Sequence, residues 1–548
     1  MHAQNTLAAL LLLHTGVTAQ TPGMLDPNFN TNGYTITDLS GANVYDGAVG
    51  LATSTSLGVT TYFVLGTAEV PASTGTKFTL ALYGADGNLQ SSAFHQIDPT
   101  DITQARACAR VNSIVPGQSN YFITGLIELP NGTKVWHLAK LGASLTLLTS
   151  FSDNGWTETN LGGPNTDVAA MAVQPDGKVI LAGYIDDNIA LLRHTADGPL
   201  DVAFSTDGRV VSNVPGGIED KASALAVAQD GSIFVAGTVL LDNGQNQRRG
   251  FVGKYLQNGD LDLGWGTNGF IMLHWGGSGV NDPWGTAITG SSFINSMAIG
   301  PDNKLVVVGR SVSGGTEPDQ DFCIARLNAD GTLDPGFSTD GKQRVGFAPA
   351  GNGANVDGAT SVVVDGEGGV IVAGEVQGST ASKVGIARFN PNGAPDTDFG
   401  TSGNGMLITD FGGLGHTVGQ VLLDAQGRIV VTGSWRSLQS TTTNSFIARY
   451  IGVVVGVLEL SAVEGIISVY PNPVAGPTTF EYTLAEVERL TITLTDLQGR
   501  VITTFLDGQM MPAGAHQQTV TMPPQLAHGN YLLVFSSPNG RMSVQISK

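Results

Sequence analysis

The sequence contains one short apolar strand seven times, and each copy ends at a glycine. The copies are FVLG ending at Gly66, FITG at Gly125, ILAG at Gly183, FVAG at Gly237, VVVG at Gly309, IVAG at Gly374 and VVTG at Gly433. A short unbroken run of β-branched residues is typical of a strand buried on both faces. Seven copies at near-constant spacing indicate a repeat architecture.

Two further markers flank each apolar strand. Ahead of it lies an aromatic anchor followed by small polar residues, and behind it lies another strand that ends in an aromatic or aliphatic residue. The clear anchors are Phe29, Phe151, Phe204, Trp265, Phe337 and Phe399, and Phe94 is a weaker copy. With one more apolar stretch between anchor and glycine, each unit holds about four strands in roughly 60 residues, the size of a propeller blade.

The two ends of the repeat region complement each other. The first unit starts at its anchor, near Leu25 to Phe29, and lacks the strand that should precede it. The last unit ends on that strand, Phe446 to Tyr450, and lacks the following anchor. We therefore predict a seven-bladed ring closed by pairing of the two ends, because an open solenoid would need atypical capping repeats.

A basic residue on the third-marker strand is followed eight positions later by an acid. The pairs are Arg193 and Asp201, Lys254 and Asp262, Arg326 and Asp334, and Arg388 and Asp396. Arg449 has no downstream acid and Asp26 has no upstream base, so we predict that these two pair across the ring closure. The alternative is a set of independently solvated charges, since surface pairs contribute little to stability.

The connections fall into two classes. Short Asp-Gly and Asn-Gly turns, such as Asp176-Gly177 and Asn392-Gly393, occupy one rim of the expected ring. The connections on the opposite rim vary in length, and we expect a ligand there. The longest path carries His274, Trp275, Asp282 and Trp284. Exposed tryptophans can stack on sugars or anchor a protein partner, whereas the alternative is a loop that packs its tryptophans on its own blade.

The combination LDPGFSTDG, VIVAG and FCIARLNADGTLD resembles the delta-60 repeat, over about Leu25 to Tyr450. This resemblance implies a propeller-like domain of a secreted or surface bacterial protein. It carries no catalytic residues, so it implies no chemistry.

The composition changes after Tyr450, and alternating strands predict a small C-terminal β-sandwich. Three motifs occur in order: Pro471-Asn472-Pro473, then Asp496 with Gly499-Arg500, then Gly529 with Tyr531. Together they resemble the type A sorting domain of the type IX secretion system. The resemblance implies export from a Gram-negative bacterium through the periplasm, by the type IX machinery, with release or surface attachment. The alternative is an ordinary accessory sandwich.

These features predict an all-β chain with four parts. Residues 1–20 are expected to be a signal peptide with the apolar run Leu7 to Leu13, although no Lys or Arg precedes it, which puts the assigned start in question. A propeller spans 21–452, with units near 25–88, 89–145, 146–199, 200–260, 261–332, 333–394 and 395–450. A linker covers 453–465, and the sandwich covers 466–548. No stretch is long enough to predict a membrane span.

Charge and motifs exclude several function classes. A formal net charge of -20 disfavours nucleic acid and anionic lipid as partners. We find no catalytic, cofactor-binding or metal-binding motif in a credible context. Cys108 and Cys323 fall at different places in different repeats, so no disulfide is expected. The acids Glu317, Asp319 and Asp321 can hold a cation, but solvated side chains are the simpler interpretation.

We therefore expect a secreted or cell-surface propeller that acts as a binding or adhesion scaffold for a surface glycan or protein. One alternative is a glycan-active hydrolase or lyase with its site in the propeller funnel. Another alternative is a structural surface component. Two carboxylates about 5 to 10 Å apart in one pocket would favour the enzyme, whereas a funnel lined by small and apolar residues would favour the scaffold.

Overall fold

The regular elements of the described residues are all β-strands. The computed structural model describes residues 21–39, 46–56, 59–69, 76–95, 102–112, 119–129, 131–142, 146–152, 154–242, 247–275, 280–281, 287–288, 290–312, 320–347, 356–378, 381–438, 442–452, 468–470, 474, 477–484, 487–495, 501–523, 526, 529–537 and 540–548. The expected signal peptide 1–20 and linker 453–465 lie outside this set.

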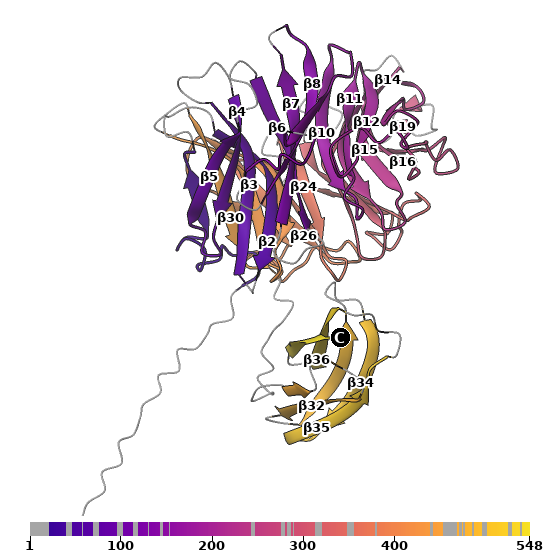
Figure 1. Ribbon diagram of the computed structural model, residues 1–548. Coiled ribbons are helices and arrows are strands. Elements are labelled where there is room, and N and C mark those ends of the chain that lie inside the picture. Colours follow the sequence, from indigo (N-terminus) through magenta and orange to yellow (C-terminus); the bar gives the residue numbers. More distant parts are fainter. Residues whose placement is uncertain are drawn as a thin grey trace, which may run out of the picture.

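Between residues 34 and 450 the described strands form seven four-stranded antiparallel sheets and one two-stranded ribbon (Figure 1). We number the sheets in chain order. Sheet 1 contains β2 (Asp46–Ser56), β3 (Val59–Glu69), β4 (Thr76–Tyr83) and β5 (Leu89–His95); sheet 2 contains β6 (Ile102–Asn112), β7 (Ser119–Glu128), β8 (Lys134–Leu141) and β9 (Trp156–Thr159); sheet 3 contains β10 (Thr166–Val173), β11 (Val179–Ile185), β12 (Asn188–His194) and β13 (Arg209–Ser212). Sheet 4 contains β14 (Gly217–Val227), β15 (Ile233–Leu241), β16 (Arg248–Tyr255) and β17 (Phe270–Leu273); sheet 5 contains β20 (Ser291–Ile299), β21 (Leu305–Val312), β22 (Gln320–Leu327) and β23 (Lys342–Val345); sheet 6 contains β24 (Gly358–Val364), β25 (Val370–Gln377), β26 (Ser382–Phe389) and β27 (Met406–Thr409). Sheet 7 contains β28 (Gly415–Leu423), β29 (Ile429–Arg436), β30 (Thr443–Tyr450) and β1 (Tyr34–Thr37), and the ribbon pairs β18 (Val280–Asn281) with β19 (Ala287–Ile288).

The first strand of each sheet lies against the first strand of the next one. This series runs from β2 through β6, β10, β14, β20 and β24 to β28, and β28 returns to β2. The sheets therefore stand in a closed ring with one inner strand each, and the expectation of an all-β propeller is confirmed. Figure 1 shows the N-terminal sheet, in indigo, beside the orange strands of sheet 7.

The sheets are offset from the sequence units by one strand. The strand that follows each anchor pairs outward with the preceding sheet, as β13 pairs with β12 after Phe204. The Asn-Gly and Asp-Gly turns that precede the anchors, such as Asn392-Gly393, thus lie between the third and fourth strands of one sheet. They still share a rim with the turns between first and second strands, because both follow an odd-numbered strand of the meander. Phe94 is no anchor, since it lies within β5 itself.

Every inner strand carries a β-bulge opposite the repeated glycine. In sheet 6, Ala359 pairs with Gly374, and the register shifts before Ser361. The bulge brings a backbone carbonyl so close that a Cβ on Gly374 would lie 2.1 Å from Gly358 O. The same approach is 1.9 Å at Gly66 and 1.8 Å at Gly309. The glycine that ends each apolar run is therefore required by a close backbone contact rather than by a turn.

Each anchor joins its sheet to the next. At the seam between sheets 5 and 6, Arg326 lies over the ring of Phe337 at 4.8 Å, donates from Nε to Asp334 at 2.6 Å and donates from Nη1 to the carbonyl of Pro391 at 2.5 Å. Ser338 N also donates to Asn392 O at 2.8 Å. Gly393 packs on Phe337, and a Cβ there would lie 3.0 Å from the ring. We call this set of contacts an interlock. It consists of a basic residue, an acid eight positions later, the aromatic anchor, and the glycine turn of the next sheet.

The ring closes through the same interlock, built from both ends of the domain. β1 pairs antiparallel with β30, with Tyr34 opposite Ala448. Arg449 donates from Nε to Asp26 Oδ2 at 2.8 Å, lies 4.7 Å over the ring of Phe29, and donates to Ala85 O of sheet 1 at 2.5 Å. The structure therefore brings together the Arg449 and Asp26 side chains that the sequence spacing paired.

The C-terminal residues form two facing sheets. One orders its strands as β31 (Ser468–Tyr470), β32 (Pro477–Leu484) and β35 (Gly514–Thr521); the other runs β34 (Val501–Met511), β33 (Glu488–Thr495), β36 (Asn530–Ser537) and β37 (Gly540–Ser547). Phe480 and Tyr482 from the first sheet share a buried cluster with Leu490, Ile492 and Phe535 from the second. This is the β-sandwich expected from the alternating pattern.

The glycine contact makes a first prediction. Gly374→Ala should lower the free energy of unfolding by about 2 kcal/mol or more, because the added methyl group forces a backbone shift in a packed sheet. Gly358→Ala in the same sheet is the matched control, since its Cβ would meet only Arg310 side-chain atoms at 3.8 Å. Urea unfolding of both variants checks this, and equal losses would contradict it.

The closure pair makes a second prediction. Asp26→Asn should cost about 3 kcal/mol of unfolding free energy, because it leaves the buried Arg449 guanidinium without its counter-charge. Asp410→Asn removes the exposed pair of Asp410 with Lys383, whose charged atoms lie 3.2 Å apart, and should change stability by about 0.5 kcal/mol or less. Chemical denaturation of the two variants side by side tests the difference, and a near-neutral Asp26→Asn would refute it.

Candidate functional site

At the level of the bulges, hydrogen bonds between neighbouring sheets surround the central channel. Ser223 donates to Ile294 O at 2.5 Å and Asn295 donates to Ala359 O at 2.8 Å. Farther round the ring, Val421 N donates to Ser361 at 3.1 Å and Leu51 N donates to Gln420 at 2.7 Å. Side chains of one sheet thus satisfy backbone groups of the next. The described channel wall here is lined by neutral residues, and the hydrogen bonds above engage four of its polar side chains.

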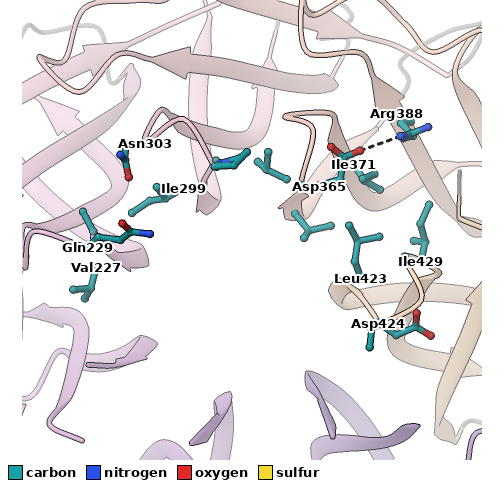
Figure 2. A pocket seen from close by; sticks show the side chains of 18 residues that line it. Val227, Gln229, Ile299, Asn303, Asp365, Ile371, Arg388, Leu423, Asp424 and Ile429 are labelled. Atoms are coloured by element: carbon teal, nitrogen blue, oxygen red, sulfur yellow. Dashed lines mark hydrogen bonds and ion pairs between the residues drawn. The ribbon is translucent and has the colours of Figure 1, made fainter. Parts of the chain in front are cut away.

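The channel widens into a cavity of about 710 Å³ on the rim of the short Asp-Gly turns (Figure 2). The inner strands of sheets 4, 5, 6 and 7 end there on one aliphatic residue each, and we call these four residues the collar. They are Val227, Ile299, Val364 and Leu423. Ile371 and Ile429 lie behind the collar, and Gln229 and Asn303 border the entrance. The cavity is therefore an aliphatic hollow with a polar edge.

The charged groups of this cavity are paired with one another. Arg388 donates to Asp365 at 2.9 Å and also to Asp396. Asp424 accepts from Arg428 at 2.7 Å and from the Tyr62 hydroxyl at 2.9 Å. Burial, together with the charge of Asp424, raises the pKa of Tyr62 to about 12, so this hydroxyl remains a donor at neutral pH. Because Asp365 and Asp424 are each paired with an arginine, neither carboxylate is positioned as a free general acid or base.

On the opposite rim, residues at the start of the inner strand cap the connection that leads into it in four of the sheets. Asp46 accepts from Leu39 N at 2.7 Å, Asp220 from Val214 N at 2.7 Å, and Asp357 from Phe347 N at 3.0 Å. In sheet 5 the equivalent contact joins Ser292 to the backbone N of Trp275 at 3.3 Å. Trp275 thus takes the place that Leu39, Val214 and Phe347 hold in the other sheets.

Trp275 is partly buried against the core of sheets 4 and 5, and its indole Nε1 donates to Ile324 O at 3.0 Å. The carbonyl of His274 accepts from Lys342 Nζ at 3.4 Å. The other two expected ligand residues, Asp282 and Trp284, lie outside the described residues, between the two strands of the ribbon. The structure therefore brings His274 and Trp275 together at the base of the 274–290 connection.

The remaining expected features have ordinary surroundings where the structure describes them. Asp321 forms an ion pair with Arg344 at 2.5 Å, while Glu317 and Asp319 lie outside the described residues. Cys323 is fully buried, and the side chain of Cys108 is not described. Across the described part of the chain, no group of three His, Cys, Asp or Glu side chains could hold a metal ion. No helix among these residues has the length and hydropathy to cross a membrane.

The sorting motif can be followed in part. Gly529 and Lys548 exchange two backbone hydrogen bonds of 3.0 and 2.9 Å, which fix the chain end to the start of β36. Tyr531 packs with Val474, Leu494 and Ile546 in a small buried cluster. The other motif residues, Pro471, Asn472, Pro473, Asp496, Gly499 and Arg500, lie outside the described residues.

Reasoning from sequence missed the collar. Each of its residues stands immediately before a short turn, as Leu423 stands before Asp424, and an aliphatic residue recurs at this end position in consecutive units. This periodic signal was present. An alignment of the repeats that marked the last residue of each inner strand would have found it, because these residues lie at the same level along the ring axis.

Comparison with protein families supports both parts of the chain. Residues 174–204, 300–337 and 368–399 match a family described as "Domain of unknown function (DUF5122) beta-propeller". Residues 468–547 match the "Secretion system C-terminal sorting domain". The expected propeller and type IX sorting tail are thereby confirmed. Among curated proteins no sequence matches.

Solved structures give only distant likenesses. A protein from Lactobacillus plantarum is 12% identical, with 73% of this chain and 87% of that chain covered and a TM-score of 0.37. Sqt1 from Chaetomium thermophilum, bound to the N-terminus of ribosomal protein L10, is 11% identical, with 74% and 97% covered and a TM-score of 0.38. An exo-beta-1,3-galactanase from Phanerochaete chrysosporium is 11% identical, with 93% and 100% covered and a TM-score of 0.29. At these scores no ligand or activity transfers to this chain.

The cap at Asp220 predicts a pH dependence. Burial, then the nearby charges of Asp187 and Glu219, raise its pKa to about 6 from an ordinary value near 4. The folded state therefore binds a proton more tightly than the unfolded state, so stability falls as pH rises from about 4 to about 6, by up to about 3 kcal/mol. Asp220→Asn should remove this fall. Unfolding free energies of wild type and variant across pH 4 to 7 check it, and parallel curves would contradict it.

Proposed function

We propose that this chain, which joins a β-propeller to a secretion system C-terminal sorting domain, is a secreted or surface-displayed binding scaffold. In the finer form of the proposal, a seven-bladed ring is exported from a Gram-negative bacterium by the type IX machinery, after a signal peptide takes it to the periplasm. The sorting domain supports secretion or surface localisation, and the ring supplies the rigid frame.

The observation that carries the proposal is the contrast between the two rims. On the Asp-Gly rim the interlocks constrain both sequence and length, because Arg326 and its equivalents reach the turn of the next sheet. Connections on the opposite rim range from the two-residue turn Asp186–Asp187 to the stretch 274–290. A rigid ring that carries connections of unequal length on one rim is the usual arrangement of a binding protein.

The 274–290 connection is our candidate for the ligand contact. Trp275 fixes its base, since the indole ring packs on the core and its N–H is already bonded. We propose that Asp282 and Trp284 meet a surface glycan or a protein, with His274 beside them. A stacking aromatic next to a carboxylate suits the apolar face and the hydroxyls of a sugar ring.

We do not extend the proposal to catalysis. The two aspartates at the channel mouth, Asp365 and Asp424, are each held by an arginine. A glycosidase needs two carboxyl groups that can act on the substrate, one as the general acid and the other as a base or nucleophile.

Binding of the full chain to a glycan array and to intact bacterial cells tests the proposal. Trp284→Ala should weaken binding at least tenfold, because a stacking aromatic supplies much of such a contact. Ile218→Ala is the matched control, since Ile218 is an exposed apolar residue at 53% on the same rim of another sheet. Equal binding by the wild type and Trp284→Ala would remove this site from consideration.

A further inference from the structure

The cavity at the collar lies on the rim opposite the 274–290 connection. The four collar residues are partly buried, and each keeps some of its surface exposed. Each collar residue packs one side on a core cluster of the ring: Val227 on that of sheets 3 and 4, and Ile299 on that of sheets 4 and 5. Val364 and Leu423 do the same in the following sheets. Their remaining surfaces face the cavity, where water would be a poor partner for them.

The polar groups of the cavity sort into two kinds. Asp365, Arg388 and Asp424 are held in ion pairs, so none of them offers an uncompensated charge to a ligand. Gln229 and Asn303 stand on the turns at the entrance, and Asn303 takes a positive φ of 60° that fixes its turn. Figure 2 shows Gln229 and Asn303 on one side of the opening, with Leu423 and Ile429 across it.

From this lining we propose that the channel mouth binds a neutral aliphatic small molecule. Its hydrocarbon part contacts the collar, and its hydroxyl, ester or amide group meets the side-chain amides of Gln229 and Asn303. The volume of about 710 Å³ lies within the range of small-molecule sites. The lining also has the composition of such sites, which is mostly apolar with a few fixed polar groups.

The charges decide between neutral and ionic ligands. An anion would find Arg388 already paired with two aspartates, on a chain with a formal net charge of -20. A cation would find the carboxylates already bound to Arg388 and Arg428, and it would lose its hydration shell among aliphatic side chains. A sugar is disfavoured for a different reason, because the described lining contains aliphatic side chains but no aromatic ring on which a sugar could stack.

Three ligands of one chain length separate these cases. The full chain is loaded with Nile red as a reporter, and the dye is displaced by 1-decanol, decanoate or decylamine. We expect 1-decanol to displace the dye at a concentration at least fivefold below that of either ion. Equal displacement by all three, or a preference for decanoate or decylamine, would overturn the proposal.

Substitutions in the collar test whether the ligand binds there. Val227→Met extends a longer apolar side chain into the hydrocarbon site without adding polarity, and Ile299→Asn puts an amide in the collar; each should weaken 1-decanol binding at least fivefold. Ile218→Asn on the opposite rim is the matched control and should leave binding unchanged. Thermal melting checks that each variant is folded. If Ile299→Asn does not fold, the result for Val227→Met alone tests whether the ligand binds at the collar. Unchanged 1-decanol binding by Val227→Met would overturn the site.

The site is independent of the glycan or protein contact proposed above. Trp284→Ala should not alter 1-decanol binding, and Val227→Met should not alter binding to the array. A loss of 1-decanol binding in Trp284→Ala would place the aliphatic ligand on the other rim and would refute the channel mouth.

Discussion

A buried guanidinium at the seam between neighbouring sheets is the contact on which this ring depends. Arg193, Arg326 and Arg449 each donate to an aspartate of their own interlock and to a backbone carbonyl of the next sheet. An aromatic ring covers the guanidinium in all three cases. A buried charge without its partners is costly, so the arginine requires the neighbouring sheet to be in place. Packing of one sheet on the next is thereby tied to one geometry.

The same contact explains which parts of the fold could be read from sequence. The base and the acid lie eight residues apart across the bend between the third and fourth strands, so their pairing is local and shows as a fixed spacing. The match between Arg449 and Asp26 followed from the same spacing, applied to a ring whose ends complete each other.

The sequence spacing could not show which four consecutive strands make up one sheet. A periodic sequence is the same whichever strand is counted first, and only the backbone pairing shows that the strand after each anchor belongs to the preceding sheet. The repeated glycine was visible, but its cause depends on the bulge in another strand, which leaves no local mark. Phe94 resembled an anchor because its neighbours are small and polar, although the sheet 1 turn ends before Leu89 and leaves no anchor loop.

Function in this chain divides between the two rims. One rim is built from interlocks and surrounds an aliphatic mouth, and the other carries connections that vary freely. Trp275 shows how the two roles can be confused in a sequence, because a tryptophan in a long connection suggests a ligand contact. Its backbone N bonds Ser292 as the equivalent residues bond their own caps, which assigns its indole to the core.

The position of β1 in sheet 7 has a consequence for the order in which the chain can assemble. The last sheet draws one strand from the beginning of the domain and three from its end, and the contact between Asp26 and Arg449 joins residues 423 positions apart. Sheets 1 to 6 can form as their strands become available. The N-terminal strand has no partner until β30 exists, so a chain interrupted before Tyr450 would leave its first segment and the flank of sheet 1 open to water. Closure of the ring therefore requires that both ends of the domain have been synthesised.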